Sequence, residues 1–145
     1  MNDSTEDWSQ LRTAIGPATF VPDAIDRMLG AHSDSEAADA YWELDNRVVI
    51  QGQLFEAAEQ TTMTLLSRLL SGDSTPAGVG RALDLLVEIA AGEPDTTELA
   101  RGNDGLAERC LALISAAAGG LREIPTAENP RAAAALQDLL AEMAE

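Results

Sequence analysis

Side chains that commonly carry out chemistry are scarce in this sequence. It contains one histidine, His32, and one cysteine, Cys110. One histidine cannot build a two-histidine metal site, and no spacing pairs His32 with Cys110 or with a particular serine. Cys110 stands between leucines at helical spacing, where a small buried hydrophobic side chain is expected rather than a nucleophile. A lone cysteine also excludes an intramolecular disulfide.

Motifs for cofactors and for catalysis are missing as well. The sequence has no spaced Asp/Asn loop of the EF-hand type, and Gly78 and Gly80 lack the lysine and the preceding strand of a phosphate-binding loop. With 25 acidic residues, some carboxylates approach each other in any fold, so no general acid–base pair stands out. We therefore expect a protein that is not an enzyme and that uses no metal or cofactor.

Acidic residues are the strongest candidates for a binding function. One row of them follows helical spacing on the face opposite the apolar residues, and further acids lie just beyond the next glycine. A solvated face is one interpretation of such a row. The other is a docking surface for a basic protein, where charge speeds association and excludes wrong partners. The predicted partner-binding residues are Asp34, Glu36, Asp39, Glu43, Glu56 and Glu59.

The overall charge narrows the choice of partner. The chain of 145 residues has nine arginines, no lysine and 25 acidic residues, a formal net charge of −16. Nucleic acids and anionic membranes are polyanions that require basic patches, so neither is expected as a partner. The N-terminal sequence MNDSTEDW lacks the apolar core of a signal peptide, and no apolar run is long enough to span a membrane. We expect a cytoplasmic protein, and the sequence leaves its oligomeric state open.

The stretch from Tyr41 to Leu70 is expected to organise the fold. Apolar residues at positions 37, 41, 44 and 48, and at 38, 42 and 49, form two adjacent helical stripes. Gly52 interrupts this pattern, as a residue beyond a helix end would. The prediction is a pair of helices hinged at Gln51–Gly52, with Trp42 and Leu44 buried in the core.

Asp45 interrupts the apolar face of the same stretch, between Trp42 and Val49. We expect its carboxylate to pair locally with Arg47 or Arg81, and we keep a binding role as the alternative.

The other segments complete an all-α prediction. Apolar spacing, with proline or glycine at the breaks, predicts helices over about 8–15, 21–29, 76–91, 106–118 and 130–143. N-caps are expected at Ser33 or Ser35, at Thr75 and at Asn129. Residues 93–104 are expected to form a surface loop with at most one helical turn, and residues 1–7 to be frayed. No strand is predicted. Residues 1–145 thus form one domain of six or seven helices, either a compact bundle or a short α-solenoid.

Several motifs resemble small bacterial HEAT-like (armadillo-like) α-solenoid proteins. They are Trp8-x-x-Leu11, Gly16-x-Ala18-x-x-Val21-Pro22, Gln51-Gly52-x-Leu54-x-x-Ala57-Ala58 and Arg81-Ala82-Leu83-Asp84-Leu85-Leu86. The resemblance extends to about Ala91 and implies a solenoid of helix pairs. The family often has a histidine before Gln-Gly, where this chain has Ile50, and this difference weakens any functional role for that corner.

Some members of that family are thought to be toxin-immunity proteins. The resemblance therefore implies a non-catalytic protein-binding module, an acidic immunity-type inhibitor or scaffold that docks a basic, toxin-like protein. The alternative that the sequence leaves open is a small-molecule-binding or enzymatic protein with a pocket between helices.

Overall fold

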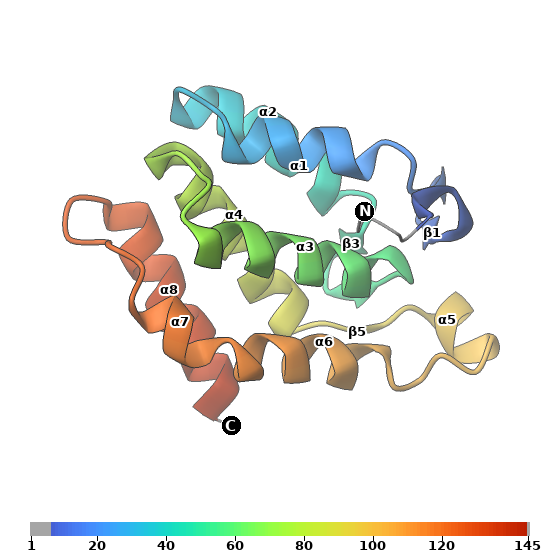
Figure 1. Cartoon of the computed structure of the whole chain (residues 1–145). Coiled ribbons are helices and arrows are strands. Elements are labelled where there is room, and N and C mark those ends of the chain that lie inside the picture. The colour runs from blue at the N-terminus through green and yellow to red at the C-terminus, as the bar shows by residue number, and fades with distance from the viewer. Residues whose placement is uncertain (1–6, 145) are drawn as a thin grey trace.

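The computed structural model describes residues 7–144, and helices make up most of this part (Figure 1). The prediction of a mostly helical chain is confirmed, whereas the short strands are new. The α-helices are α1 (Val21–Leu29), α2 (Asp34–Asp45), α3 (Ala57–Ser71), α4 (Pro76–Ala90), α5 (Thr96–Ala100), α6 (Leu106–Ala116), α7 (Ala118–Arg122) and α8 (Pro130–Ala144). The other elements are the 3-10 helix η1 (Trp8–Gln10) and the strands β1 (Arg12–Thr13), β2 (Gly16–Pro17), β3 (Val49–Ile50), β4 (Gln53–Leu54) and β5 (Glu93–Pro94).

Helix starts follow the predicted caps. The hydroxyl of Ser33 accepts a hydrogen bond from the backbone N–H of Glu36 at 3.2 Å, and that of Thr75 accepts one from Gly78 at 3.1 Å. The side-chain oxygen of Asn129 accepts one from the N–H of Ala132 at 3.3 Å. Each of these bonds satisfies a backbone donor that a helix leaves unpaired in its first turn. Local sequence therefore determines where α2, α4 and α8 begin.

The Gln51–Gly52 corner is a β-hairpin turn, so the predicted hinge between two helices is wrong. Helix α2 ends at Asp45, and β3 pairs with β4 in an antiparallel register that joins Val49 to Leu54. Gln51 and Gly52 have φ angles of 49° and 83°, the left-handed pair that a tight two-residue hairpin turn requires. Strand β5 then adds to β4 in parallel and ties this corner to the connector after α4.

The segment over residues 8–15 is likewise not the short helix that its apolar spacing predicts. After η1 the chain forms a second small hairpin, in which β1 pairs with β2. The Thr13 hydroxyl donates to the carbonyl oxygen of Gly16 at 2.8 Å, and Gly16 itself has a φ of 82°. Residues 1–6 of the segment expected to fray lie outside the described residues, and Asp7 caps η1 by accepting from the N–H of Ser9 at 3.0 Å.

Helix α4 lies at the centre of the molecule, in place of the predicted stretch Tyr41–Leu70. It packs against α1, α2, α3, α6 and α8, and its buried side chains include Leu83, Leu86 and Ile89. Its first turn touches the end of α1 directly, because a Cβ added at Gly78 would come within 2.6 Å of the carbonyl oxygen of Met28. Of the elements that carry the candidate sites, α2 packs against α4, and α6 packs against both α3 and α4.

Helix α2 buries the first of the two predicted apolar stripes, so the buried face is narrower than the wide face that was predicted. Ala37, Ala40, Tyr41 and Leu44 are buried, and the prediction for Leu44 is confirmed. Trp42 is 52% exposed, so its predicted place in the core is wrong. In the second stripe, Trp42 faces solvent and Ala38 is half-buried, because α1 and α4 cover the other side of α2, whereas Val49 is buried in β3.

The connector over residues 93–104 is more ordered than the predicted surface loop. It contains β5 and α5, and the side chain of Glu98 in α5 is 1% exposed. The next predicted helix ends at Ala116, and the glycine pair 119–120 lies inside the separate short helix α7. Within residues 7–144, no helix combines the length and the apolar composition needed to cross a membrane.

Candidate functional site

Two of the predicted binding residues on α2 are neutralised by arginines of neighbouring helices. The guanidinium of Arg81 contacts both carboxylate oxygens of Asp34 at 3.0 Å, and Arg131 from α8 reaches the same group at 3.4 Å. Arg27 of α1 binds Glu43 through two hydrogen bonds of 2.9 and 2.8 Å. These hydrogen bonds lower the pKa of both carboxyl groups below its ordinary value. Asp34 and Glu43 therefore stay ionised, but their charge is already paired.

Glu36 and Asp39 differ from their neighbours in this row. The Glu36 carboxylate accepts from the backbone N–H of His32 at 2.9 Å, and together with the Ser33 hydroxyl it caps the start of α2. Asp39 is exposed and has no side-chain hydrogen bond or ion pair to residues 7–144. A groove of about 350 Å³ between α1 and α2 has both carboxylates in its wall. Asp39 is thus the predicted α2 residue whose charge remains available.

Trp42 is the functional candidate that sequence reasoning missed on this helix. It lies three residues after Asp39, one helical turn along, with about half of its surface in solvent. Its ring meets that of Tyr41 edge to face, with the centroids 5.0 Å apart and the planes at 78°. This contact with a buried neighbour restrains the indole, so α2 presents a positioned aromatic side chain beside a free carboxylate.

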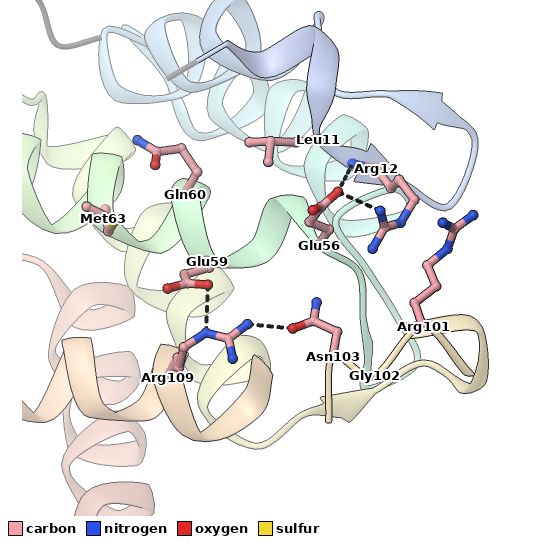
Figure 2. Close-up of a pocket in the computed structure, with 10 residues that line it drawn as sticks. All are labelled: Leu11, Arg12, Glu56, Glu59, Gln60, Met63, Arg101, Gly102, Asn103 and Arg109. Carbon is pink, nitrogen blue, oxygen red and sulfur yellow. Dashed lines mark hydrogen bonds and ion pairs between the residues drawn. The ribbon is translucent and has the colours of Figure 1, made fainter. Parts of the chain in front are cut away.

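Glu56 and Glu59 lie on a different surface, in a polar pocket of about 650 Å³ (Figure 2). The pocket is formed by the segment around Leu11, the first turns of α3, the loop after α5 and the start of α6. Its charged walls are Arg12, Glu56, Glu59, Arg101 and Arg109. The six predicted binding residues therefore separate into two groups, four on α2 and two at this pocket.

A continuous set of polar contacts surrounds the pocket floor. Arg12 binds the Glu56 carboxylate through its guanidinium at 3.1 Å and through its backbone N–H at 2.9 Å. On the other side, Arg109 donates to Glu59 at 3.0 Å and also binds the side-chain oxygen of Asn103. Each glutamate is therefore held by an arginine from another element.

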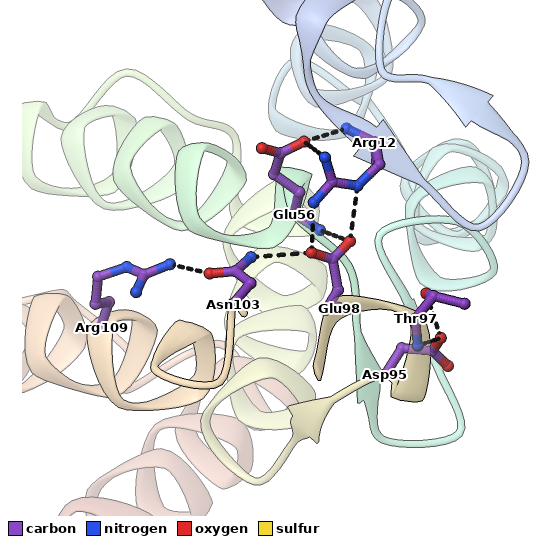
Figure 3. A network of polar contacts seen from close by, with 7 residues as sticks. All are labelled: Arg12, Glu56, Asp95, Thr97, Glu98, Asn103 and Arg109. Atoms are coloured by element: carbon purple, nitrogen blue, oxygen red, sulfur yellow. Dashed lines mark hydrogen bonds and ion pairs between the residues drawn. The ribbon is translucent and has the colours of Figure 1, made fainter. Parts of the chain in front are cut away.

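Buried Glu98 joins the two sides of this network (Figure 3). Its carboxylate accepts from the Arg12 guanidinium at 2.7 and 3.2 Å, from Asn103 Nδ2 at 2.9 Å and from the Glu56 backbone N–H at 3.2 Å. Burial alone raises the pKa of Glu98, but the hydrogen bonds and charge of Arg12, with those of Asn103 and Glu56, together lower it. Glu98 is therefore ionised, and one buried charge ties β1, α3 and the loop after α5 together.

Arg101 is the second residue that the sequence did not single out. It is exposed at the C-terminal end of α5, and Gly102 follows it with a φ of 84°. Within residues 7–144 its guanidinium has no ion pair or hydrogen bond, and Figure 2 draws no interaction to it. The pocket therefore has one guanidinium without a partner in the part of the chain that the structure describes.

The expected pairing of Asp45 with Arg47 or Arg81 is wrong. Arg47 stacks over the Phe20 ring at 4.9 Å, and Arg81 binds Asp34. Asp45 instead faces Glu88 of α4, which also accepts a hydrogen bond from the Tyr41 hydroxyl. Burial, with the hydrogen bond and the charge of Glu88, raises the pKa of Asp45 to about 7. Oδ1 of Asp45 is buried and has no hydrogen-bond partner among the described residues, so the carboxyl group of Asp45 has no arginine to offset its charge.

The lone cysteine and histidine have the environments that the sequence indicates. Cys110 is buried, and burial raises the pKa of its thiol to about 11, which keeps it protonated and weakly nucleophilic. His32 is exposed. Among the residues that the structure describes, no group of three His, Cys, Asp or Glu side chains is placed to hold a metal ion.

Comparison of the chain with protein-family models, with curated proteins and with solved structures gave no match. The resemblance to HEAT-like proteins therefore rests on the sequence motifs, and function must be argued from the two surfaces described above.

Proposed function

We propose that this protein is a non-catalytic binding module that docks a basic protein partner on the solvent face of α2. The observation that carries the proposal is Trp42, which is half exposed and lies one turn from Asp39, a carboxylate that no side chain of residues 7–144 pairs. Tryptophan is enriched among the residues that dominate binding energy at protein interfaces, because it offers a large, rigid contact area. The carboxylate of Asp39 supplies charge complementarity to a basic surface of the partner.

The shape of the α2 surface supports the same partner. The groove between α1 and α2 is lined by Glu36 and Asp39 of α2 and by Asp26 and Arg27 of α1. The guanidinium of Arg27 is already bound to Glu43. A lysine or arginine side chain of the partner fits there, with its stem along the groove and its charge at Asp39. The net charge of −16 adds long-range attraction for a basic partner, which raises the association rate at low salt.

An immunity-type inhibitor in the cytoplasm is the specific form of this proposal that the HEAT-like resemblance suggests. The close pairing of α1 with α2 agrees with a helix-pair repeat. The packing of α8 and α1 on the same central helix agrees better with a bundle, since each solenoid repeat contacts only its neighbours. The solenoid architecture thus stays a hypothesis.

The test is affinity purification of partners from the source cells with four baits in parallel. These are the wild type, Trp42→Ala, Asp39→Arg and, as the control, Asp138→Arg on α8, whose carboxylate is also exposed. We expect a basic protein to be retained by the wild type and the control and lost from the two α2 variants. The association rate of that protein should fall steeply between low and physiological salt. Equal retention on all four baits would remove α2 from the binding surface.

A further inference from the structure

The last residue of α2, Asp45, turns its carboxyl group into the interface with α4. Its Oδ1 atom is buried and has no hydrogen-bond partner within residues 7–144. The group that it faces is a second carboxyl, that of Glu88 in α4. The C-terminal end of a helix also carries partial negative charge, so α2 itself disfavours an anion there. Ionisation of Asp45 is therefore opposed by burial, by Glu88 and by the end of its own helix.

The charged groups of the elements around Asp45 do not offset this repulsion. Asp84 of α4 adds a further negative charge in the neighbourhood of Tyr41. Strand β3, which also packs on α2, has no titratable side chain. The arginines of the surrounding elements bind other groups: Arg27 of α1 binds Asp23 and Glu43, Arg81 of α4 lies over the Tyr41 ring but binds Asp34, as does Arg131 of α8, and Arg47 after α2 stacks on Phe20.

Tyr41 connects this interface to Trp42. The Tyr41 hydroxyl donates to the Glu88 carboxylate, and the Tyr41 ring meets the indole of Trp42 edge to face. Trp42 lies three residues before Asp45, in the same turn at the end of α2. The contact that restrains the indole therefore depends on how closely this turn packs on α4.

We propose that Asp45 and Glu88 form a pH-sensitive switch at the end of α2. When Asp45 is protonated, the last turn of α2 packs on α4, and Tyr41 holds Trp42 in place. When Asp45 is ionised, repulsion from Glu88 opens the turn and releases the indole. The switch is a property of the free protein, whereas its effect on docking rests on the proposed function of α2. A partner should bind more tightly when Asp45 is protonated, because the tryptophan is then already positioned for the interface.

The direction and size of the response follow from the ionisation of Asp45. Its pKa is about 7 in the closed turn and returns to about 3.9 once the carboxyl group reaches water. Because the pKa is raised, the stability of the closed turn is complete below about pH 4 and is lost as the pH rises to about 7. Over that interval the equilibrium constant for opening increases by up to about tenfold per pH unit, and above it the constant stays level.

The experiment is amide hydrogen exchange, followed by NMR on the ¹⁵N-labelled full chain from about pH 5 to about pH 7.5 and corrected for the intrinsic pH dependence of exchange. The signals are the backbone amides of residues 41–45 and the indole N–H of Trp42, which Trp8→Phe distinguishes from that of Trp8. Asp45→Asn removes the charge and keeps the size of the side chain. The matched control is Asp138→Asn, at an exposed aspartate of α8, and His32→Gln removes the one histidine, a residue type that titrates near neutral pH.

In the wild type, protection at residues 41–45 should fall by about tenfold or more over this pH range, and the Trp42 signal should shift over the same range. Asp138→Asn and His32→Gln should behave like the wild type, and Asp45→Asn should keep its protection at every pH. The proposal is overturned if protection at residues 41–45 does not depend on pH, or if the dependence persists in Asp45→Asn. An equal loss of protection in α6 would also overturn it, because Asp45 would then affect only global stability. The affinity purification above gives a separate outcome, so docking and the switch can fail independently.

Discussion

Removing the buried charge at Glu98 tests whether the pocket network stabilises the fold. Glu98→Gln keeps the shape of the side chain but replaces one acceptor oxygen with an NH₂ donor. At one oxygen position this NH₂ group would face the donors of Arg12 and of the Glu56 backbone, and at the other it would face the donor of Asn103. Hydrogen bonds to a charged group contribute about 1.5–3 kcal/mol. We expect Glu98→Gln to lower the free energy of unfolding by about 2 kcal/mol.

Glu98→Ala should cost more, because it leaves the guanidinium of Arg12 without its buried partner. Breaking a buried ion pair costs about 3–5 kcal/mol, and Arg12 is 35% exposed and regains water, so we expect the lower end, about 3 kcal/mol. Urea unfolding of both variants at pH 7 measures these values. Glu93→Gln, at an exposed glutamate of β5, is the matched control and should change stability by less than about 0.5 kcal/mol.

The pH dependence gives an independent check on the same residue. Since the pKa of Glu98 is lower in the folded protein than in the unfolded chain, the unfolded chain binds more protons on acidification. The stabilisation is therefore complete above the unfolded pKa of about 4.3 and is lost as the pH falls through the folded pKa. The stability difference between wild type and Glu98→Gln should shrink below about pH 4. A difference that stays constant from pH 7 to pH 3, or a cost of Glu98→Ala below about 1 kcal/mol, would refute the argument that this charge holds the pocket.

Three further changes test the packing around α4. Leu44→Ala should cost about 2–5 kcal/mol in urea unfolding, because Leu44 is fully buried, and a loss below about 1 kcal/mol would contradict its place in the core. Asp45→Asn should raise the free energy of unfolding by about 1–2 kcal/mol at pH 8 and by less at pH 5. The reason is that the raised pKa of Asp45 makes the wild type less stable as the pH rises from about 4 to about 7. An equal effect at both pH values would show that the charge of Asp45 is unimportant. Gly78→Ala should lower the free energy of unfolding by about 1–3 kcal/mol, since the new Cβ meets the backbone of α1. The control is Gly119→Ala at a helical glycine with open space around it, which should cause no loss of stability. Thermal unfolding of both variants measures the difference.

Helix positions could be predicted from sequence where local chemistry decides them. Ser33, Thr75 and Asn129 cap the helices that follow, and the left-handed Gly72 ends α3. These devices act within a few residues, so the sequence contains the whole cause. The hairpin at Gln51–Gly52 was not predicted because its local sequence is ambiguous. Apolar positions before it fit a helical stripe, while the run Val48–Ile50 and the glycine also fit a strand and a tight turn.

The exposure of Trp42 depends on tertiary contacts and could not be predicted from spacing. Two adjacent apolar stripes on α2 are equally suited to burial, and the side covered by α1 and α4 contains Tyr41 and Leu44. The central role of α4 is hidden for the same reason. The sequence gives no reason for the glycines at 78 and 80, and only the approach of α1 and of Arg131 shows why small residues stand there.

The acidic surface shows why formal charge is a poor measure of the charge that a partner meets. Asp34 is paired with Arg81 and Arg131, which lie in helices far along the chain, and helical spacing carries no sign of such contacts. Pairing removes Asp34, Glu43, Glu56 and Glu59 from the free acids, and capping occupies Glu36. What remains of the predicted row is Asp39, and its position beside Trp42 makes it a candidate for docking. A surface for a basic partner then needs one free acid at an aromatic anchor, with the remaining negative charge of the chain acting at long range on the rate of encounter.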